Sequence, residues 1–512
     1  MEAVKLDLYG LKFTSCTNPG SPRRSCPGSD AIPSRGFMRD FLPPSENWVR
    51  WLLLLAALSF ATTLFLPYVG EEAVYTLTSQ EMAASRDYFV TTLYGGIYGR
   101  PPLLNWLMIP LAELLGWERV LLASRLLAAA STLASALILA WLARRLTRNR
   151  NFAMLAALVY LTSDALLYRG WLAYSDPLFS CLVFGAIASA WIGVRERRPG
   201  LLALAVLAVS AGALAKVQTA YLFYGVALLA LLADREQRRF LLGRSSLALH
   251  GAAVAGFLAW HGALSHGTQA ATTLFDIGYK FRTADGAAYL AQLGTFPLET
   301  LARFLPASAV ALYFLLRRRC RPDTAAFPAA PLRAMLLINY LPYWLAPQSH
   351  IRYVMPLYPL FALFIAHLLW QAGKPALRAA TYWMAATVAL KFALGLWAFP
   401  AYQERFRGDY AATARDIVGR TAGFPLYATD VSASGLSVAA HVNTLRRPAP
   451  PLRFPPERWE SGFVLAYAEN PALGQVAHRY ALGANDLYLL CRGAACRPTA
   501  PAASGNPDQA GD

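Results

Sequence analysis

Carboxylates in this chain lie where long apolar runs begin or end. Glu71 and Glu72 directly follow the first such run, and Asp176 opens a later one. Burying a charge at such a place is costly, so ionisable residues there indicate function more often than ordinary surface charges do. A carboxylate can take the proton from an acceptor hydroxyl. We therefore interpret Glu71 as a candidate catalytic residue, assisted by Glu72 or Asp176.

Basic residues occupy matching positions between the apolar runs. Arg100 precedes two prolines, Lys216 interrupts an apolar stretch, and Arg352 stands before another. Guanidinium and ammonium groups of this kind can hold the charge of a phosphate leaving group. We predict that these three bind a donor phosphate. Neighbouring rings are candidates for substrate contacts: Tyr98, His350 and Tyr353.

Each of these residues also has a purely structural interpretation. An acidic residue such as Asp176 at the start of a helix is commonly a cap. A single Lys216 at a membrane interface commonly extends its charge towards lipid headgroups. The Glu71-Glu72 pair could be a solvated loop face, and His350 a structural ring. The functional interpretation depends on all of them facing the same side.

The composition is that of a membrane protein. Of 512 residues, 56% are hydrophobic and only 15% are charged, against about 45–50% and 25% in soluble domains. The mean hydropathy is +0.35. The formal charge of +17 could suit nucleic acid, but the arginines lie in short clusters between apolar runs, which is typical of membrane topology. We therefore exclude nucleic acid as a partner.

The apolar runs predict a polytopic helical protein with about 11 transmembrane helices, since a span needs about 20 apolar residues. The runs are 48–68, 120–142, 152–168, 174–194, 200–215, 217–233, 246–264, 297–316, 332–346, 353–371 and 376–399. With the N-terminus inside, every arginine cluster falls on the inner side, as the positive-inside rule requires. The candidate site residues and everything after Pro400 then lie outside.

These spans predict four regions. Residues 1–47 form a disordered cytoplasmic segment, within which Met38 is an alternative start. Residues 48–399 form the transmembrane catalytic domain, with a large first outer loop at 69–118 that carries an interfacial stretch. Residues 400–497 form a small α/β domain with a helix at 410–420 and strands at 425–429, 436–440, 462–467 and 486–490. Residues 498–512 form a disordered tail.

The motifs resemble those of the GT-C glycosyltransferases over roughly residues 50–400. They are Glu71-Glu72-Ala73, a Pro-Pro-Leu-Leu-x-Trp segment at 101–106, Ser175-Asp176-Pro177, Leu-x-Lys at 214–216 and an Arg-Tyr-x-x-Pro-Leu-Tyr-Pro segment at 352–359. The nearest group is the bacterial aminoarabinose lipid A transferases and protein O-mannosyltransferase-like enzymes. This resemblance implies that Glu71 is catalytic and that Arg100 replaces the family's phosphate-binding lysine.

The chain departs from the family pattern at two positions. Relatives often have a glutamate, proposed as a metal partner, where this chain has Gly99, so a divalent metal ion is an open question and no other cofactor is expected. Lys216 is followed by Val217 instead of the usual glycine. We therefore expect the loop after Lys216 to differ in shape from that of the relatives.

We interpret the chain as an inner-membrane glycosyltransferase that moves a sugar from a polyprenyl-phosphate donor to an acceptor on the periplasmic side. The resemblance implies an inverting mechanism. Lipid A, lipopolysaccharide, another glycan or a protein could be the acceptor. The main alternative is a polyprenyl-lipid flippase or transporter, which would favour mid-membrane polar residues and repeat symmetry. A catalytically inactive assembly protein is a second alternative.

Two cysteines near the end of the chain are predicted to form a disulfide. Cys491 and Cys496 are separated by Arg-Gly-Ala-Ala. The predicted topology places both in an oxidising compartment, where exposed thiol pairs commonly pair.

Overall fold

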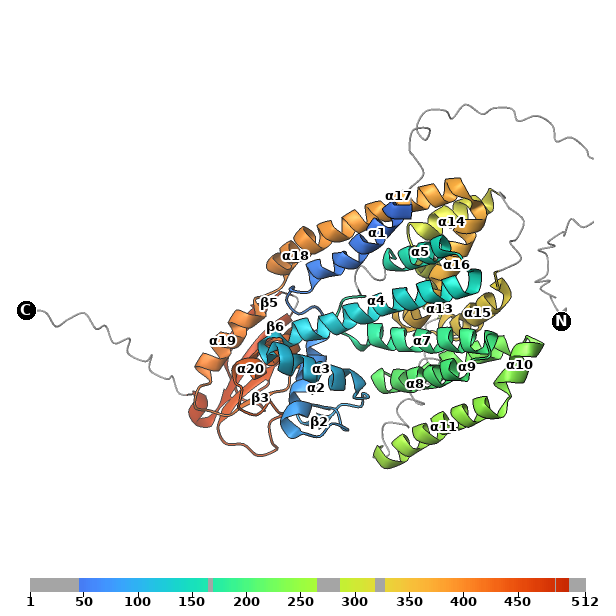
Figure 1. Cartoon of the computed structure of the whole chain (residues 1–512). Coiled ribbons are helices and arrows are strands. Elements are labelled where there is room, and N and C mark those ends of the chain that lie inside the picture. Colours follow the sequence, from blue (N-terminus) through green and yellow to red (C-terminus); the bar gives the residue numbers. More distant parts are fainter. Residues whose placement is uncertain (1–45, 164–168, 265–285, 318–326, 484, 497–512) are drawn as a thin grey trace, which may run out of the picture. The chain divides into compact units, whose positions relative to one another are not determined.

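A computed structural model describes residues 46–163, 169–264, 286–317, 327–483 and 485–496, and the chain is mostly helical there (Figure 1). The elements up to residue 264 are α1 (Glu46–Leu58), η1 (Ser59–Thr63), α2 (Glu72–Ser85), β1 (Thr92–Leu93), β2 (Gly96–Ile97), α3 (Leu103–Leu115), η2 (Trp117–Arg119), α4 (Val120–Thr147), α5 (Arg150–Leu161), α7 (Ser175–Arg195), α8 (Pro199–Ala215), α9 (Thr219–Leu231), α10 (Arg235–Leu241) and α11 (Arg244–Leu264). The later helices before the tail are α13 (Gly286–Ala302), α14 (Ala307–Leu316), α15 (Ala329–Leu345), η3 (Ile351–Leu357), α16 (Tyr358–Ala372), α17 (Lys374–Ala393), η4 (Leu394–Ala398) and α18 (Phe399–Phe406).

The helices are those of a membrane protein, as the composition predicts. Within the described residues, four helical segments are long and apolar enough to cross a membrane, or six if each of two bent helix pairs forms one span. The four are Trp117–Thr147, Ser175–Arg195, Ile351–Ala372 and Lys374–Arg420. Shorter apolar helices, α5, α8 and α9 among them, lie at other predicted runs. The count of eleven spans therefore stays a prediction.

Helix α7 lies inside the bundle and opens at the candidate site. It packs against α4, α8 and α9, which run beside it in Figure 1. Its residues from Ser175 to Ser180 are buried, and Asp176 lies in its first turn. A negative charge there is favoured by the helix dipole. The bundle thereby fixes the position of Asp176 relative to its neighbours.

The tail contains a four-stranded sheet with two helices. Its elements are α19 (Tyr410–Arg420), β3 (Leu426–Ala428), α20 (Ala433–Leu445), β4 (Gly462–Ala466), β5 (Gln475–Leu482), β6 (Asn485–Arg492) and η5 (Gly493–Cys496). The strand order is β3-β4-β6-β5, with β3 parallel to β4 and the other pairs antiparallel. Helix α20 is the crossover between the parallel strands.

The expected strand at 436–440 is wrong, because these residues lie within α20. Ser432 caps this helix by accepting a hydrogen bond from the backbone of Gly435 at 3.1 Å. A short apolar run fits a buried helix as well as a strand, and the cap decides here. Strand β5 was not expected, because most of its residues are exposed and it carries little apolar signal.

The tail shares a hydrophobic core with the first outer loop. Tyr68, Leu77 and Leu93 cluster with buried tail residues such as Leu436 and Leu489. Helix α2 packs directly against α20. The loop that follows the first apolar run is therefore held from two sides, by the bundle and by the tail.

Candidate functional site

Glu71 is presented at the start of α2 by a tight turn. The preceding Gly70 has a φ of +60°, and a Cβ there would lie 2.6 Å from the hydroxyl oxygen of Tyr174. That hydroxyl accepts a hydrogen bond from the backbone N–H of Glu71 at 3.0 Å. The side chain of Glu71 is exposed. The turn thus holds the backbone while leaving the carboxylate accessible to a substrate.

The neighbouring Glu72 is entirely buried, and its contacts stabilise the fold. Its carboxylate pairs with Arg125 at 2.6 Å, and both side chains are 0% exposed. It also accepts the backbone N–H groups of Val69 at 2.8 Å and Ala173 at 2.7 Å. Glu72 therefore has a structural role, since it is buried and both of its oxygens have partners, and its assistance to catalysis stays an untested prediction.

Arg125 is a site-building residue that the sequence interpretation missed. Besides Glu72, it donates to the carbonyl oxygens of Thr63 at 3.2 Å and Pro67 at 2.8 Å. Its guanidinium lies 5.1 Å from the ring centre of Trp171. The signal was available in the sequence, because a single arginine inside a long apolar helix needs buried partners. The Glu72–Arg125 pair ties together the segments on both sides of Glu71.

Arg100 lies among tyrosines that orient it. It donates to the hydroxyl of Tyr75 at 2.9 Å, and that hydroxyl is 3.1 Å from the hydroxyl of Ser175. The guanidinium lies 5.4 Å from the ring centre of Tyr98. Tyr75 raises the pKa of Arg100, with smaller contributions in the same direction from the predicted site residues Tyr98, Glu71 and Asp176, while burial opposes them. Arg100 is therefore charged and interacts electrostatically with both Glu71 and Asp176.

Asp176 and Lys216 form an ion pair with each other. Their side chains are only 11% and 14% exposed, and Lys216 ends α8 directly beside the start of α7. The ammonium of Lys216 lies 5.8 Å from the ring centre of Tyr353. The structure therefore brings both residues to the site, but with their charges already compensating one another.

His350, Arg352 and Tyr353 lie at the start of η3, which packs against α7. Arg352 lies 5.3 Å from the ring centre of Tyr353 and interacts electrostatically with Asp176 and Glu71. His350 and Arg352 line a polar cavity of about 350 Å³, which Arg169, Glu299 and Arg303 also line. All nine predicted catalytic, phosphate-binding and substrate-binding residues thus lie on elements that meet around the start of α7. Glu72 is the one whose contacts stabilise the fold.

An apolar cavity of about 540 Å³ begins beside Arg100. One wall is α8, through residues such as Val206 and Leu207, and the other is α11, through Ala253, Gly256 and Phe257. Small residues on α11 leave the space open, since a Cβ on Gly256 would meet nothing within 4 Å. The arrangement is a mostly apolar cavity with one cation, Arg100, in its wall.

The described residues do not fit a metal ion well. No group of three or more His, Cys, Asp or Glu side chains suitable for a metal is found among them. Glu72 forms an ion pair with Arg125, and Asp176 forms one with Lys216. Gly99 has no side chain that could bind a metal. We derive no step of the chemistry through a metal.

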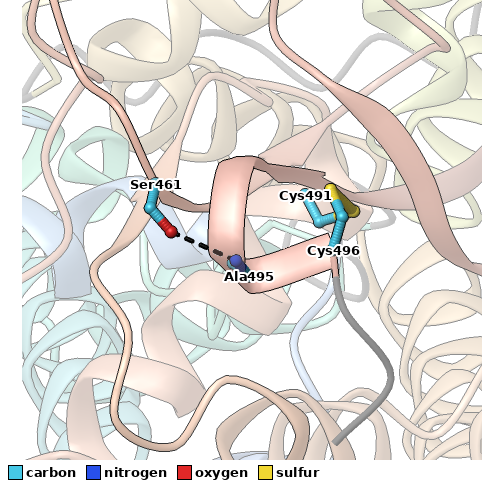
Figure 2. Close-up of a disulfide and its surroundings, with 4 residues drawn as sticks. All are labelled: Ser461, Cys491, Ala495 and Cys496. Carbon is cyan, nitrogen blue, oxygen red and sulfur yellow. Dashed lines mark hydrogen bonds between the residues drawn. A yellow bond between two sulfur atoms is a disulfide. The ribbon is translucent and has the colours of Figure 1, made fainter.

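The structure joins Cys491 and Cys496 in a disulfide, with their Cα atoms 5.1 Å apart. Figure 2 shows the bridge closing the short helical turn η5, where the backbone N–H of Ala495 donates to Ser461 at 3.1 Å. The bridge pins the end of β6, far along the chain from the candidate site.

Parts of the chain are similar to proteins that are named as sugar transferases. The family described as dolichyl-phosphate-mannose-protein mannosyltransferase matches residues 99–261. An undecaprenyl phosphate-alpha-4-amino-4-deoxy-L-arabinose arabinosyl transferase of Edwardsiella ictaluri is 35% identical over 123 residues, 24% of this chain and 22% of that protein. A second transferase of the same description from Pseudomonas fluorescens is 27% identical over 171 residues, 32% of this chain and 29% of that protein.

The fold comparison extends over most of the chain. The crystal structure of ArnT from Cupriavidus metallidurans bound to undecaprenyl phosphate has a TM-score of 0.67 at 15% identity, covering 89% of this chain and 100% of that one. The apo structure of the same protein gives 0.62 at 16% identity, covering 89% and 99%. The aligned parts of the curated relatives are less than a third of their length. Likeness at this level establishes the fold.

Proposed function

We propose that this chain, a helical membrane protein that resembles the GT-C aminoarabinose transferases and shares their fold, transfers a sugar from a polyprenyl-phosphate donor to an acceptor. The observation that carries the proposal is the apolar cavity of about 540 Å³ whose lining includes Arg100. A polyprenyl phosphate has this same division into a long apolar tail and an anionic head. The two relatives above act, by their names, on an undecaprenyl-phosphate sugar.

The charges around Arg100 suit the head of such a donor. Arg100 binds the phosphate and is held in place by Tyr75 and Tyr98. Arg352 approaches from the opposite segment as a second cation. Lys216 is paired with Asp176. It becomes a third cation at the site when the phosphate replaces Asp176 as its anionic partner. The phosphate is then surrounded by fixed positive charge, which stabilises it as a leaving group.

Glu71 serves as the general base in the proposed reaction. Its exposed carboxylate takes the proton from an acceptor hydroxyl while the acceptor oxygen forms a bond to the anomeric carbon. The bond from that carbon to the phosphate oxygen breaks, and the polyprenyl phosphate leaves with its charge held by Arg100. A single displacement of this kind inverts the configuration at the anomeric carbon. Asp176 orients Lys216 in this scheme.

The acceptor approaches through the polar cavity beside Arg352. Among the described residues, its lining includes three arginines, Arg169, Arg303 and Arg352, and one carboxylate, Glu299. Such a surface favours an acceptor that carries acidic groups. Lipid A and lipopolysaccharide fit this description best among the candidate acceptors, which also include other glycans and proteins.

We further propose that the chain crosses the bacterial inner membrane eleven times, with its N-terminus cytoplasmic and residues 400–497 periplasmic. The arginine clusters at 144–150, 195–198, 235–244 and 317–321 support this orientation, because basic loops stay inside. The disulfide at Cys491 and Cys496 also suits an oxidising compartment. The site residues then face the periplasm. The flippase alternative finds no support in the comparisons.

A matched pair of glycine variants on α11 tests the proposed donor site. Gly256 lines the apolar cavity and Gly251 does not, yet a Cβ on either meets nothing within 4 Å. We expect Gly256→Leu to raise the KM for a polyprenyl-phosphate sugar with little effect on kcat. The KM should rise about four-fold for each CH2 group of the donor's tail that the leucine displaces from the cavity. Gly251→Leu should match the parent chain. Equal kinetics for all three proteins would remove the cavity as the donor site.

A further inference from the structure

An aromatic cluster joins α11 to the first outer loop. The ring centres of Phe89 and Trp106 on the loop lie 6.4 Å apart. The ring centre of Trp260 on α11 lies 6.2 Å from that of Phe89 and 6.0 Å from that of Trp106. The indole N–H of Trp106 donates to the carbonyl oxygen of Tyr88 at 2.5 Å, which holds the loop next to Phe89. Trp106 ends the Pro-Pro-Leu-Leu-x-Trp segment, and the proposed reaction assigns no role to this tryptophan.

Two of the three rings line the apolar cavity whose wall includes Arg100, the donor cavity. Phe89 and Trp260 belong to its lining, and Phe89 lies on the same loop as Arg100. Phe89 is 55% exposed and Trp260 is partly exposed, so both rings have surface left for a ligand. We therefore expect a tail that fills this cavity from a phosphate at Arg100 to contact both rings.

Helix α11 lies at the edge of the helical bundle (Figure 1) and is attached to α9 independently of the cluster. The hydroxyl of Tyr224 lies 3.0 Å from Nε2 of His250, and the ring centres of Tyr221 and Phe257 lie 5.4 Å apart. Loss of the Trp260 ring should therefore leave the helix in place.

The wall that α11 contributes suits an isoprenoid better than a straight alkyl chain. From residue 252 on, α11 lines the cavity with small residues and with two rings, Phe257 and Trp260. Each isoprene unit carries a methyl branch and a planar double bond. The face of an aromatic ring carries partial negative charge, which attracts the C–H groups of such a branch. The small residues leave room for the branches, since a Cβ on Gly256 would meet nothing within 4 Å.

We propose that Phe89 and Trp260 select a branched, unsaturated isoprenoid tail over a straight alkyl chain in the donor cavity. This selection rests on the proposed function, since it takes the phosphate of the donor to lie at Arg100. Trp106 is a positioning residue, because it contacts both rings but is not among the described residues that line the cavity.

The test is equilibrium binding of radiolabelled farnesyl phosphate to the full chain in lipid nanodiscs, with dodecyl phosphate as the competitor. The two probes share the phosphate and the length of the main carbon chain, so the ratio of their affinities reports the branches and double bonds. We expect the parent chain to prefer farnesyl phosphate. Trp260→Ala should bind farnesyl phosphate about 2- to 10-fold more weakly, the range for one aromatic contact, and should lower the ratio. Trp260→Phe keeps a ring and should keep most of the preference.

Matched variants separate selection of the tail from a general loss of binding. Trp383→Ala removes an exposed tryptophan of α17 that is not among the described lining residues, and it should bind both probes as the parent does. Phe89→Ala removes the other ring from an exposed loop position, so it should lower the ratio even if Trp260→Ala does not fold.

The outcomes also distinguish this proposal from the proposed function. A parent chain without preference, an unchanged ratio in folded Trp260→Ala or in Phe89→Ala, or an equal loss of both probes would overturn the selection by these rings. A parent chain that binds neither probe would overturn the selection and the donor site together. Selective binding that depends on both rings, without any sugar transfer, would contradict the proposed function alone.

Discussion

Replacing Glu72 by Gln should destabilise the folded chain, whereas the same change at the adjacent Glu71 should not. Glu72 and Arg125 are both 0% exposed and pair at 2.6 Å. The neutral amide leaves the charge of Arg125 buried without compensation, which typically costs about 3–5 kcal/mol. The amide also has an NH2 group in place of one carboxylate oxygen. Val69 and Ala173 each donate a backbone N–H to a different oxygen of Glu72, so one of these two hydrogen bonds is lost.

The contrast with Glu71 follows from exposure. Glu71 is exposed, and the hydrogen bond that holds it in place comes from its backbone. A substitution at such a position usually changes stability by no more than about 0.5 kcal/mol. Both variants replace a glutamate by a glutamine, and the two positions are adjacent. Each variant is therefore the control for the other.

Thermal unfolding of the purified chain in detergent, followed by tryptophan fluorescence, measures the difference. Glu72→Gln should unfold several degrees below the parent and Glu71→Gln at the same temperature. Adding Arg125→Met to Glu72→Gln should recover part of the loss, because it removes the uncompensated charge. Equal midpoints for the two single variants, or further loss in the double variant, would refute the account of Glu72 as a residue that positions the loop.

Three further outcomes are expected. Arg100→Ala should raise the KM for the donor more than Arg100→Lys does, since lysine keeps the charge but loses the bidentate geometry; equal effects would move the phosphate contact to Arg352. Alkylation and peptide mapping should find Cys491 and Cys496 protected until the protein is reduced, and free thiols in the unreduced protein would contradict the bridge. Reporter fusions at residue 240 should lie inside and at residue 420 outside; an inside result at 420 would change the span count by an odd number.

The sequence predicted most elements because their signals are local. Apolar runs marked the helices, and the α19, β3, β4 and β6 segments were expected close to their observed bounds. The resemblance stated from the motifs agrees with the family match over residues 99–261, and the fold is shared with ArnT. Failures arose where tertiary contacts decide. The 436–440 run is a helix because of the cap at Ser432, and β5 pairs with β6 although most of its surface is exposed.

The site shows the same limit. The sequence placed Glu71 and Glu72 together but could not distinguish them, because the direction of each side chain depends on the turn at Gly70 and on a partner 53 residues away, Arg125. Likewise, Asp176 was predicted to assist catalysis and Lys216 to bind the donor phosphate, although the two contact one another across two helix ends. Residue types indicated the chemistry, and packing determined which groups are free to perform it.

The most direct test of the proposed function is mass spectrometry of envelope lipids and glycans from a strain lacking this chain. The strain is complemented with the parent chain, with Glu71→Gln or with the matched surface variant Glu469→Gln. One glycosylated species should lose a single sugar in the deletion and regain it with the parent and with Glu469→Gln. Glu71→Gln should restore little, because loss of a general base typically costs about 10²–10⁴-fold in rate. An unchanged profile in the deletion, or full restoration by Glu71→Gln, would contradict the account.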